Sequence, residues 1–122
     1  MKLVWSVLAV FVAVMLLAAP VLAADPCQMD PASMAPTPDA LIAHIGHARS
    51  MGHIDNGGIA NALTSQVTAA KAALARGNKA AAVNSLRGTL NLVQAQAGKH
   101  IAAECAPHLT DQTKAVIAAL GG

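Results

Sequence analysis

The chain has 122 residues, of which 55% are hydrophobic and 11% are charged, with a formal net charge of +2. It contains one Trp, one Phe and no Tyr. Single-strand nucleic-acid binders and most sugar-binding grooves stack ligands on aromatic rings, and duplex binders need a concentrated positive field. The composition therefore argues against these classes, and we expect no nucleic-acid partner.

Residues 1–23 have the pattern of a secretory signal peptide. A short positive start at residues 1–2 precedes an apolar run at 3–19, and Val-Leu-Ala at 21–23 is a small-residue cleavage site. A transmembrane anchor is the alternative, because the run approaches the roughly 18 to 20 residues that span a bilayer. Pro20 favours cleavage. Both aromatic residues leave with this segment, and one small domain remains, which we expect to be secreted or periplasmic and to have no membrane contact.

Residues 24–37 contain three prolines and predict an extended N-terminal arm. Cys27 lies in this arm, and the only other cysteine is Cys105. An even number of cysteines in an exported chain favours a disulfide. Such a bond would stabilise the fold by up to about 4 kcal/mol. Free thiols, an intermolecular bond and metal ligation are the alternatives.

The rest of the chain, residues 38–122, predicts an all-α domain, a small up-and-down bundle. We expect helices at 38–51, 58–76, 79–97 and 103–120, and the sequence contains no strand pattern. Apolar residues three or four positions apart form one stripe on each helix: Leu41, Ile42, Ile45, Ala48; Ile59, Leu63, Val67, Ala70, Leu74; Val83, Leu86, Leu90, Val93, Ala97; and Leu109, Val116, Ile117, Leu120.

The second and third helices should form a central antiparallel αα-hairpin. Gly77 can adopt the left-handed conformation that ends a helix, and Asn78 can cap the next helix. A connection this short makes neighbouring helices antiparallel.

The other helix boundaries carry similar signals. Thr37 or Asp39 should cap the first helix. Gly57 and Gly58, with Asn56 before them, are expected to form a turn with positive φ, plugged by the apolar side chain of Ile54. Gly98 should end the third helix. Pro107 predicts that the fourth helix starts late or is kinked.

These turn and stripe residues together resemble the FIMAH domain, a small helical module that commonly sits at the end of large exported bacterial proteins. The resemblance covers roughly residues 38–120 and implies an accessory, non-catalytic unit, with no catalytic residues to transfer. The residues that carry it are Gly52, Ile54, Asn56, Gly57, Gly58, Ile59, Ala60, Leu63, Ala70, Leu74, Gly77, Asn78, Ala81, Ala82, Leu86, Val93, Gly98, Lys99, Ile101, Val116 and Ile117.

Two sets of polar residues have metal-ligand spacing. His44, His47 and Met51 share one face of the first predicted helix, and imidazole with thioether suits copper; zinc is the other candidate. Met29, Met34 and His53 could add ligands. Ordinary packing at the helix rim is the competing interpretation.

The second set is His100, Glu104 and His108, which would line one face if residues 100–108 formed a straight helix. Gly98 and Pro107 make that helix doubtful, and Glu104 also suits a helix N-terminus, where the dipole stabilises a negative charge.

We find no arrangement of side chains that indicates catalysis. Glu104 is the only glutamate, and the serines have no neighbouring histidine in a nucleophile motif. We therefore expect no enzyme activity and no cofactor. The sequence favours an exported interaction module that binds an unidentified protein partner or itself in the cell envelope. The alternative function is a small periplasmic metal-binding protein that uses His44, His47 and Met51.

Overall fold

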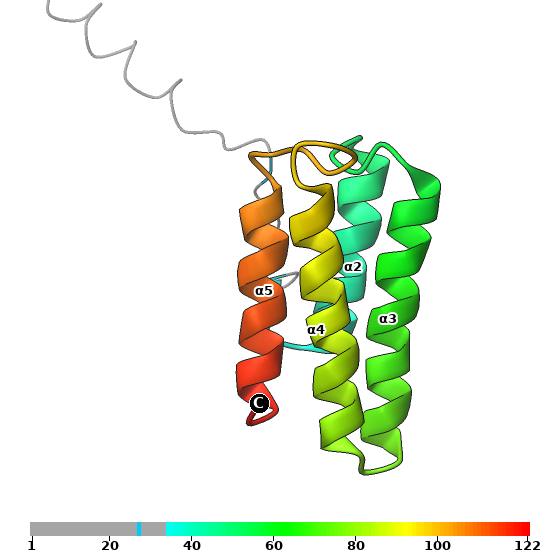
Figure 1. Cartoon of the computed structure of the whole chain (residues 1–122), viewed down its shortest axis with the longest axis vertical. Helices are drawn as coiled ribbons and strands as arrows, with labels where there is room; N and C mark the ends of the chain where they lie inside the picture. Colours follow the sequence, from blue (N-terminus) through cyan, green and yellow to red (C-terminus); the bar gives the residue numbers. More distant parts are fainter. Residues whose placement is uncertain (1–26, 28–33) are drawn as a thin grey trace, which may run out of the picture.

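The computed structural model describes Cys27 and residues 34–122, and this part of the chain is a four-helix bundle. Its helices are α2 (Pro38–Ser50), α3 (Gly57–Ala75), α4 (Lys79–Gln96) and α5 (Ala106–Ala119). Figure 1 shows them side by side and alternating in direction. The connections α2–α3 and α4–α5 lie at one end, and the α3–α4 turn lies at the other. The all-α prediction is confirmed.

The first three helices begin and end within one residue of the predicted positions, whereas the fourth begins three residues later than expected. Its first turn contains Pro107, which has no N–H to donate and so fits only where helical N–H groups lack partners anyway. The preceding segment makes a separate turn, in which the N–H of Cys105 donates to the carbonyl of Ala102 at 2.9 Å. Of the two outcomes expected from Pro107, the late start is the one observed.

Three side chains cap the helices that follow them. The oxygens of Thr37, Asn56 and Asn78 each accept a hydrogen bond from the backbone N–H three residues later, at 3.2, 3.1 and 3.0 Å. Each bond satisfies a donor that has no partner inside the helix. Thr37 is therefore the cap of α2, not Asp39.

One turn prediction is wrong. Gly57 and Gly58 do not form a turn with positive φ but are the first two residues of α3, because the Asn56 cap starts the helix directly before them. The left-handed glycine of this connection is Gly52, at φ 80°. Gly77 and Gly98 have φ of 73° and 76°, as expected for residues that follow helix ends.

The core consists of the predicted stripes, with small differences. Leu41, Ile45, Leu63, Val67 and Leu86 are all at most 1% exposed. The α4 stripe is shifted, since Leu90 is half-buried and Ala97 exposed, while Ala82 and Thr89 are buried.

Four buried polar side chains were not predicted as core: His44, Thr89, Gln112 and Thr113. The two threonines are satisfied within their own helices. Thr89 donates to the carbonyl of Ser85 at 3.2 Å, and Thr113 donates to that of Leu109 at 2.7 Å. A hydroxyl bonded in this way can be buried without leaving an unsatisfied donor.

The predicted signal peptide at 1–23 and most of the predicted arm at 24–37 lie outside the described residues. Within the described part, no helix combines the length and the apolar character needed to cross a membrane.

Candidate functional site

The two loops at one end of the bundle, residues 51–56 and 97–105, pack against each other and form what we call the loop end. Ile54 and Ile101 pair across it as an isolated antiparallel bridge. On either side of this bridge the N–H of Asp55 donates to the carbonyl of His100 at 3.0 Å, and that of Ala102 donates to the carbonyl of His53 at 2.8 Å. Both isoleucines are at most 1% exposed, so the loops are held by apolar packing as well as by hydrogen bonds.

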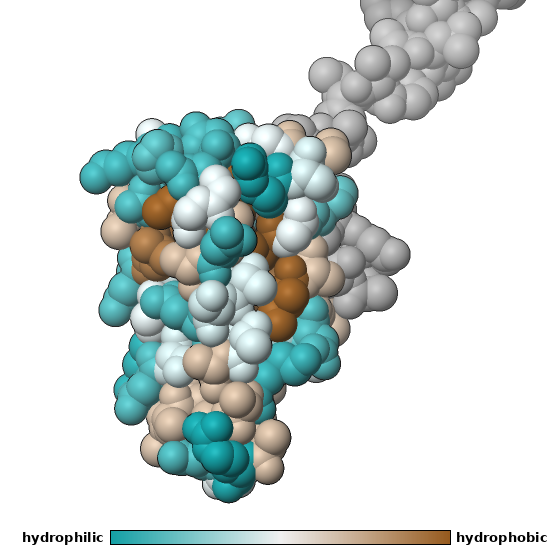
Figure 2. Space-filling view, turned by 90° about the vertical axis from the view of Figure 1, so that its right-hand side faces the viewer, coloured by the Kyte–Doolittle hydropathy of each residue, from teal (hydrophilic) through white to brown (hydrophobic). Residues whose placement is uncertain are grey.

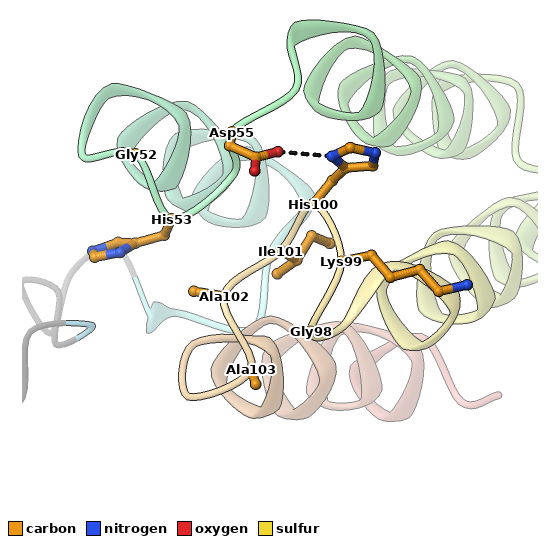
Figure 3. Close-up of a pocket in the computed structure, with 9 residues that line it drawn as sticks. All are labelled: Gly52, His53, Asp55, Gly98, Lys99, His100, Ile101, Ala102 and Ala103. Atoms are coloured by element: carbon orange, nitrogen blue, oxygen red, sulfur yellow. Dashed lines mark hydrogen bonds and ion pairs between the residues drawn. The ribbon is translucent and has the colours of Figure 1, made fainter.

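A hollow of about 270 Å³ at the loop end is lined by four ionisable residues together with glycines, alanines and Ile101. Figure 3 shows the residues that line it, with Asp55 and His100 facing each other across the two loops. The distance between His100 Nδ1 and Asp55 Oδ1 is 2.8 Å. Lys99 extends away from this pair. Because both side chains of the pair are substantially exposed, it contributes little to stability, and its groups are accessible to a ligand.

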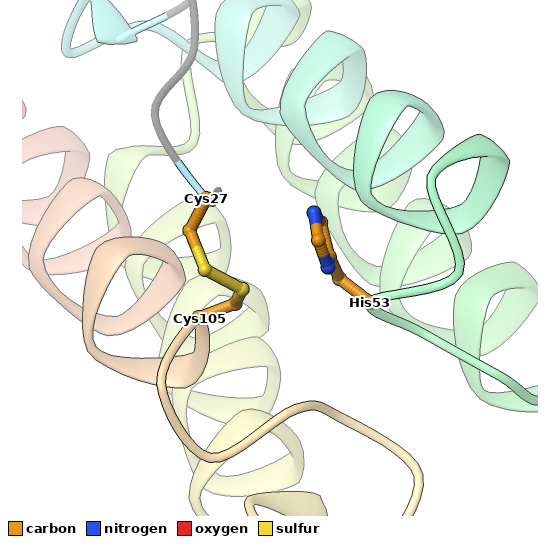
Figure 4. Close-up of side chains that lie close together, drawn as sticks. All are labelled: Cys27, His53 and Cys105. Atoms are coloured by element: carbon orange, nitrogen blue, oxygen red, sulfur yellow. A yellow bond between two sulfur atoms is a disulfide. The ribbon is translucent and has the colours of Figure 1, made fainter. Parts of the chain in front are cut away.

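Cys27 and Cys105 form a disulfide beside the loop end, with a Cα–Cα distance of 5.3 Å. Both cysteines are at most 5% exposed. Cys105 directly precedes α5, so the bond joins Cys27 in the arm to the start of that helix. Figure 4 shows the imidazole of His53 beside the two sulfurs. One ring nitrogen of His53 and the two sulfurs all lie within 4.8 Å of one another.

The structure does not bring the first predicted metal set together as accessible ligands. His44 is 3% exposed, whereas His47 is exposed and Met51, at the C-cap of α2, is 57% exposed. Met29 lies outside the described residues, and Met34 is half-buried. Helical spacing places the three residues on neighbouring parts of α2. The edge of the core passes between them, so His44 is buried while His47 and Met51 face solvent.

His44 instead belongs to a buried hydrogen-bond network between α2 and α5. Its Nδ1–H donates to Gln112 Oε1 at 2.6 Å, and Gln112 Nε2 donates to the carbonyl of Ala35 at 3.1 Å. Burial lowers the pKa of His44 below the ordinary value of 6.5, although the bond to Gln112 opposes this effect. Positive charge on His108, His47 or His53 lowers this pKa further. The neutral imidazole is therefore the form that the fold favours.

The second metal set is wrong as a helical face. Residues 97–105 are not helical, and α5 begins only at Ala106, so His100, Glu104 and His108 do not share one helix. His100 pairs with Asp55 across the loops. Glu104 is exposed and precedes α5, and His108 lies in its first turn.

Sequence reasoning missed the association of His53 with the cysteines. It placed His53 among possible extra ligands of the α2 set, because that helix is its nearest neighbour in the chain. In the described part of the chain, Cys27, His53 and Cys105 form a group of three side chains whose ligand atoms lie close enough together to surround an ion. Only the tertiary structure places Cys27 beside the loop end, so no spacing in the sequence indicates this group.

A second hollow, of about 320 Å³, lies at the opposite end of the bundle. It is lined by the start of α4 and the last residues of the chain, and Lys79 and Arg87 contribute the only charged side chains named in its lining. It has neither the paired loops nor the nearby disulfide of the loop end, and we treat the loop end as the candidate site.

Comparison with known protein families identifies a match to this chain. The family model described as the FIMAH domain matches residues 38–118, which include α2, α3, α4, the loop end and all of α5 except its last residue. No curated protein matches the chain, and no solved structure matches it.

Proposed function

Because this chain belongs to the FIMAH domain family, a family of small accessory helical modules, we propose that it is an exported, non-catalytic interaction module. It binds a protein partner, or a second copy of itself, in the cell envelope. The loop end is the surface that makes the contact.

The observation that carries this proposal is the position of Met51. It is the exposed large hydrophobic residue of the described part, and it directly precedes Gly52, which lines the hollow. Methionine is flexible and polarizable and is over-represented on adaptable binding surfaces. Asp55 and Lys99 lie at the same end of the bundle, and an apolar side chain with polar groups around it is the usual composition of a protein contact.

The helix faces are weaker candidates for the contact. Figure 2 shows one side of the molecule, where apolar residues gather in small areas separated by polar and neutral ones. Ile42, Ile59, Leu74 and Leu92 are half-buried and pack against the core. Such scattered apolar area is normal for a protein surface and does not by itself mark an interface.

The disulfide supports the exported location in this proposal. Disulfides persist in oxidising compartments and are rare in the cytosol. The Cys27–Cys105 bond spans 78 positions of sequence and therefore constrains most of the domain. This agrees with the interpretation of residues 1–23 as a secretory signal.

A capture experiment with matched variants tests the proposal. Wild type, a loop-end variant (Met51→Ser with Lys99→Ser) and a control (Lys114→Ser, exposed on α5) are each cross-linked to native envelope extract, and the captured proteins are identified by mass spectrometry. Light scattering over a range of concentrations measures self-association of the same three proteins. We expect one complex, heterologous or homologous, that forms with wild type and control and is lost in the loop-end variant.

Two outcomes would reject the proposal. Equal complex formation by all three proteins would move the contact away from the loop end. The absence of any complex, with a monomer at all concentrations, would argue against an interaction module. Circular dichroism of each variant verifies that the fold is retained.

The alternative function, a metal binder that uses His44, His47 and Met51, has no comparable support. His44 Nδ1–H already donates to Gln112, which leaves Nε2 as the nitrogen that could bind an ion, in a side chain that is only 3% exposed.

A further inference from the structure

The disulfide and His53 form a compact group of three potential ligands drawn from three separate segments. Cys27 comes from the arm, His53 from the α2–α3 loop, and Cys105 from the residue before α5. Their ligand atoms lie within 4.8 Å of one another, and Figure 4 shows the imidazole beside the bond between the sulfurs. Three ligands at this spacing could surround one ion after modest adjustment, since Zn–S and Zn–N bonds are about 2.3 and 2.0 Å long.

In the disulfide the sulfurs cannot act as thiolate ligands, so any metal chemistry here requires reduction. A dithiol reductant would break the S–S bond, supplying two electrons and two protons and becoming a disulfide itself. Cys27 and Cys105 would then be thiols. An ion with two positive charges would displace both thiol protons to solvent and bind two thiolates and one imidazole.

Two features of the surroundings bear on ion binding, the start of α5 beside Cys105 and the partial exposure of His53. Cys105 is the N-cap residue of α5, a helix of 14 residues, and the positive end of a helix dipole stabilises a negative charge there. His53 is only half-buried, so solvent reaches the imidazole side of the group. A set of two sulfurs and one nitrogen with one position open to water is a known arrangement for zinc, and soft thiolates also select Cu(I).

We propose that Cys27, His53 and Cys105 form a thiophilic metal site when the disulfide is reduced, so that a bound Zn(II) or Cu(I) ion replaces the covalent link between the arm and α5. The oxidised protein holds the arm by the S–S bond. The reduced protein holds it by two metal–sulfur bonds, with His53 joining the α2–α3 loop to the same ion. This inference does not require partner binding, although His53 and Cys105 both belong to the loop end.

Cobalt(II) is the direct probe, because its absorption spectrum reports both thiolate ligation and tetrahedral geometry. The reduced protein should bind one Co(II) with thiolate charge-transfer absorption, and Zn(II) should displace it. The oxidised protein and the double variant Cys27→Ser with Cys105→Ser should show no such absorption. A parallel titration with Cu(I) against a chromophoric competitor determines which ion is held more tightly.

The role of His53 is tested by His53→Ala, with His47→Ala and His100→Ala as matched controls on the same end of the bundle. Changes in the outer shell of a metal site already weaken binding about 10- to 100-fold. We therefore expect His53→Ala to weaken zinc binding by at least about tenfold, while the two controls retain wild-type affinity. Equal affinity in His53→Ala would overturn the three-ligand site.

A second measurement remains decisive if reduction loosens the fold. The melting temperature of the reduced protein should rise when one equivalent of Zn(II) is added, because the ion restores the link between the arm and α5. The double serine variant also has no disulfide, and its melting temperature should not respond. No thiolate absorption and no rise in the reduced wild type, or an equal rise in the double variant, would refute the proposal.

Discussion

At the scale of single residues, His44 has a different role in the fold from the one that its spacing predicts. In the sequence it is one of three candidate ligands, whereas in the structure it donates to Gln112 inside the bundle at 2.6 Å. Because His44 is buried, its protonation places a charge between α2 and α5. The stability of the fold therefore depends on pH.

We predict that the protein becomes less stable as the pH falls below about 6.5. The pKa of His44 is lowered in the folded state, so the unfolded chain binds more protons between the two pKa values. The stabilisation is complete above the unfolded pKa and is lost as the pH falls through this window, at no more than about 1.4 kcal/mol per pH unit. Urea unfolding at a series of pH values measures it.

Matched glutamine variants isolate the contribution of His44. His44→Gln should reduce this pH dependence strongly, and His47→Gln, an exposed position on the same helix that acts on His44 only through its charge, should reduce it far less. Identical pH profiles for wild type and His44→Gln would contradict the prediction. The groups that add to the effect by charge are His108 on α5, His47 on α2 and His53 in the loop.

The cap of α4 gives a second prediction at this scale. Asn78 Oδ1 accepts from the N–H of Ala81 at 3.0 Å, and Asn78→Ala removes that partner. We expect a loss of about 1 kcal/mol in the free energy of unfolding. Asn84→Ala, at an exposed position inside the same helix, should leave the free energy of unfolding unchanged or raise it by a few tenths of a kcal/mol. Denaturant unfolding measures whether each variant is less or more stable than wild type. Equal changes in the free energy of unfolding at both positions would show that the cap has no effect.

At the scale of secondary-structure elements, helix ends decide the arrangement of the bundle. The three-residue connection 76–78 makes α3 and α4 neighbours of opposite direction, as Figure 1 shows. At the other end, two longer connections pair with each other through Ile54 and Ile101. The bundle therefore has one compact end and one end with room for a functional surface.

Two glycines should respond in opposite ways to the same substitution. Gly77 has φ of 73°, a conformation that costs an L-residue about 1–2 kcal/mol, so Gly77→Ala should destabilise the protein by about this amount. Gly46 lies inside α2, and a Cβ there meets nothing within 4 Å. Gly46→Ala should therefore stabilise by about 0.5–1 kcal/mol. Thermal unfolding of both variants checks this, and a stabilised Gly77→Ala protein would be incompatible with the turn described.

At the scale of the whole molecule, the disulfide joins the arm to a bundle whose main apolar core contains neither cysteine. The helices pack through Leu, Ile, Val and Ala, so they do not require the bond to form their interfaces. Its contribution acts mainly on the unfolded chain, by closing a long loop.

We predict that Cys27→Ser with Cys105→Ser lowers stability but keeps the helices. For a separation of 78 positions, the upper chain-entropy estimate is again about 4 kcal/mol. Far-ultraviolet circular dichroism should remain helical, while the melting temperature falls. Intact-mass measurement of unreduced, natively exported protein should show that the two thiols of wild type resist alkylation. Two freely alkylated thiols there, or an unchanged melting temperature in the variant, would contradict the structural role of the bond.

The sequence by itself determined the all-α class, the four helices and most of the core, because these depend on local signals. Apolar residues three or four positions apart share one face when the chain is helical, and caps such as Asn78 act within one turn. The same locality explains the errors. At Gly57 and Gly58 two local interpretations competed, and the Asn56 cap favoured the helix.

Only the tertiary structure decided which polar residues meet. His44 with Gln112, Asp55 with His100, and His53 with the two cysteines are all brought together by helices that pack from distant parts of the chain. Helical periodicity indicates which face of its helix a residue occupies. It does not indicate which other element packs against that face. A buried histidine and an exposed ligand have the same spacing in the sequence, and they differ only in the neighbours that packing provides.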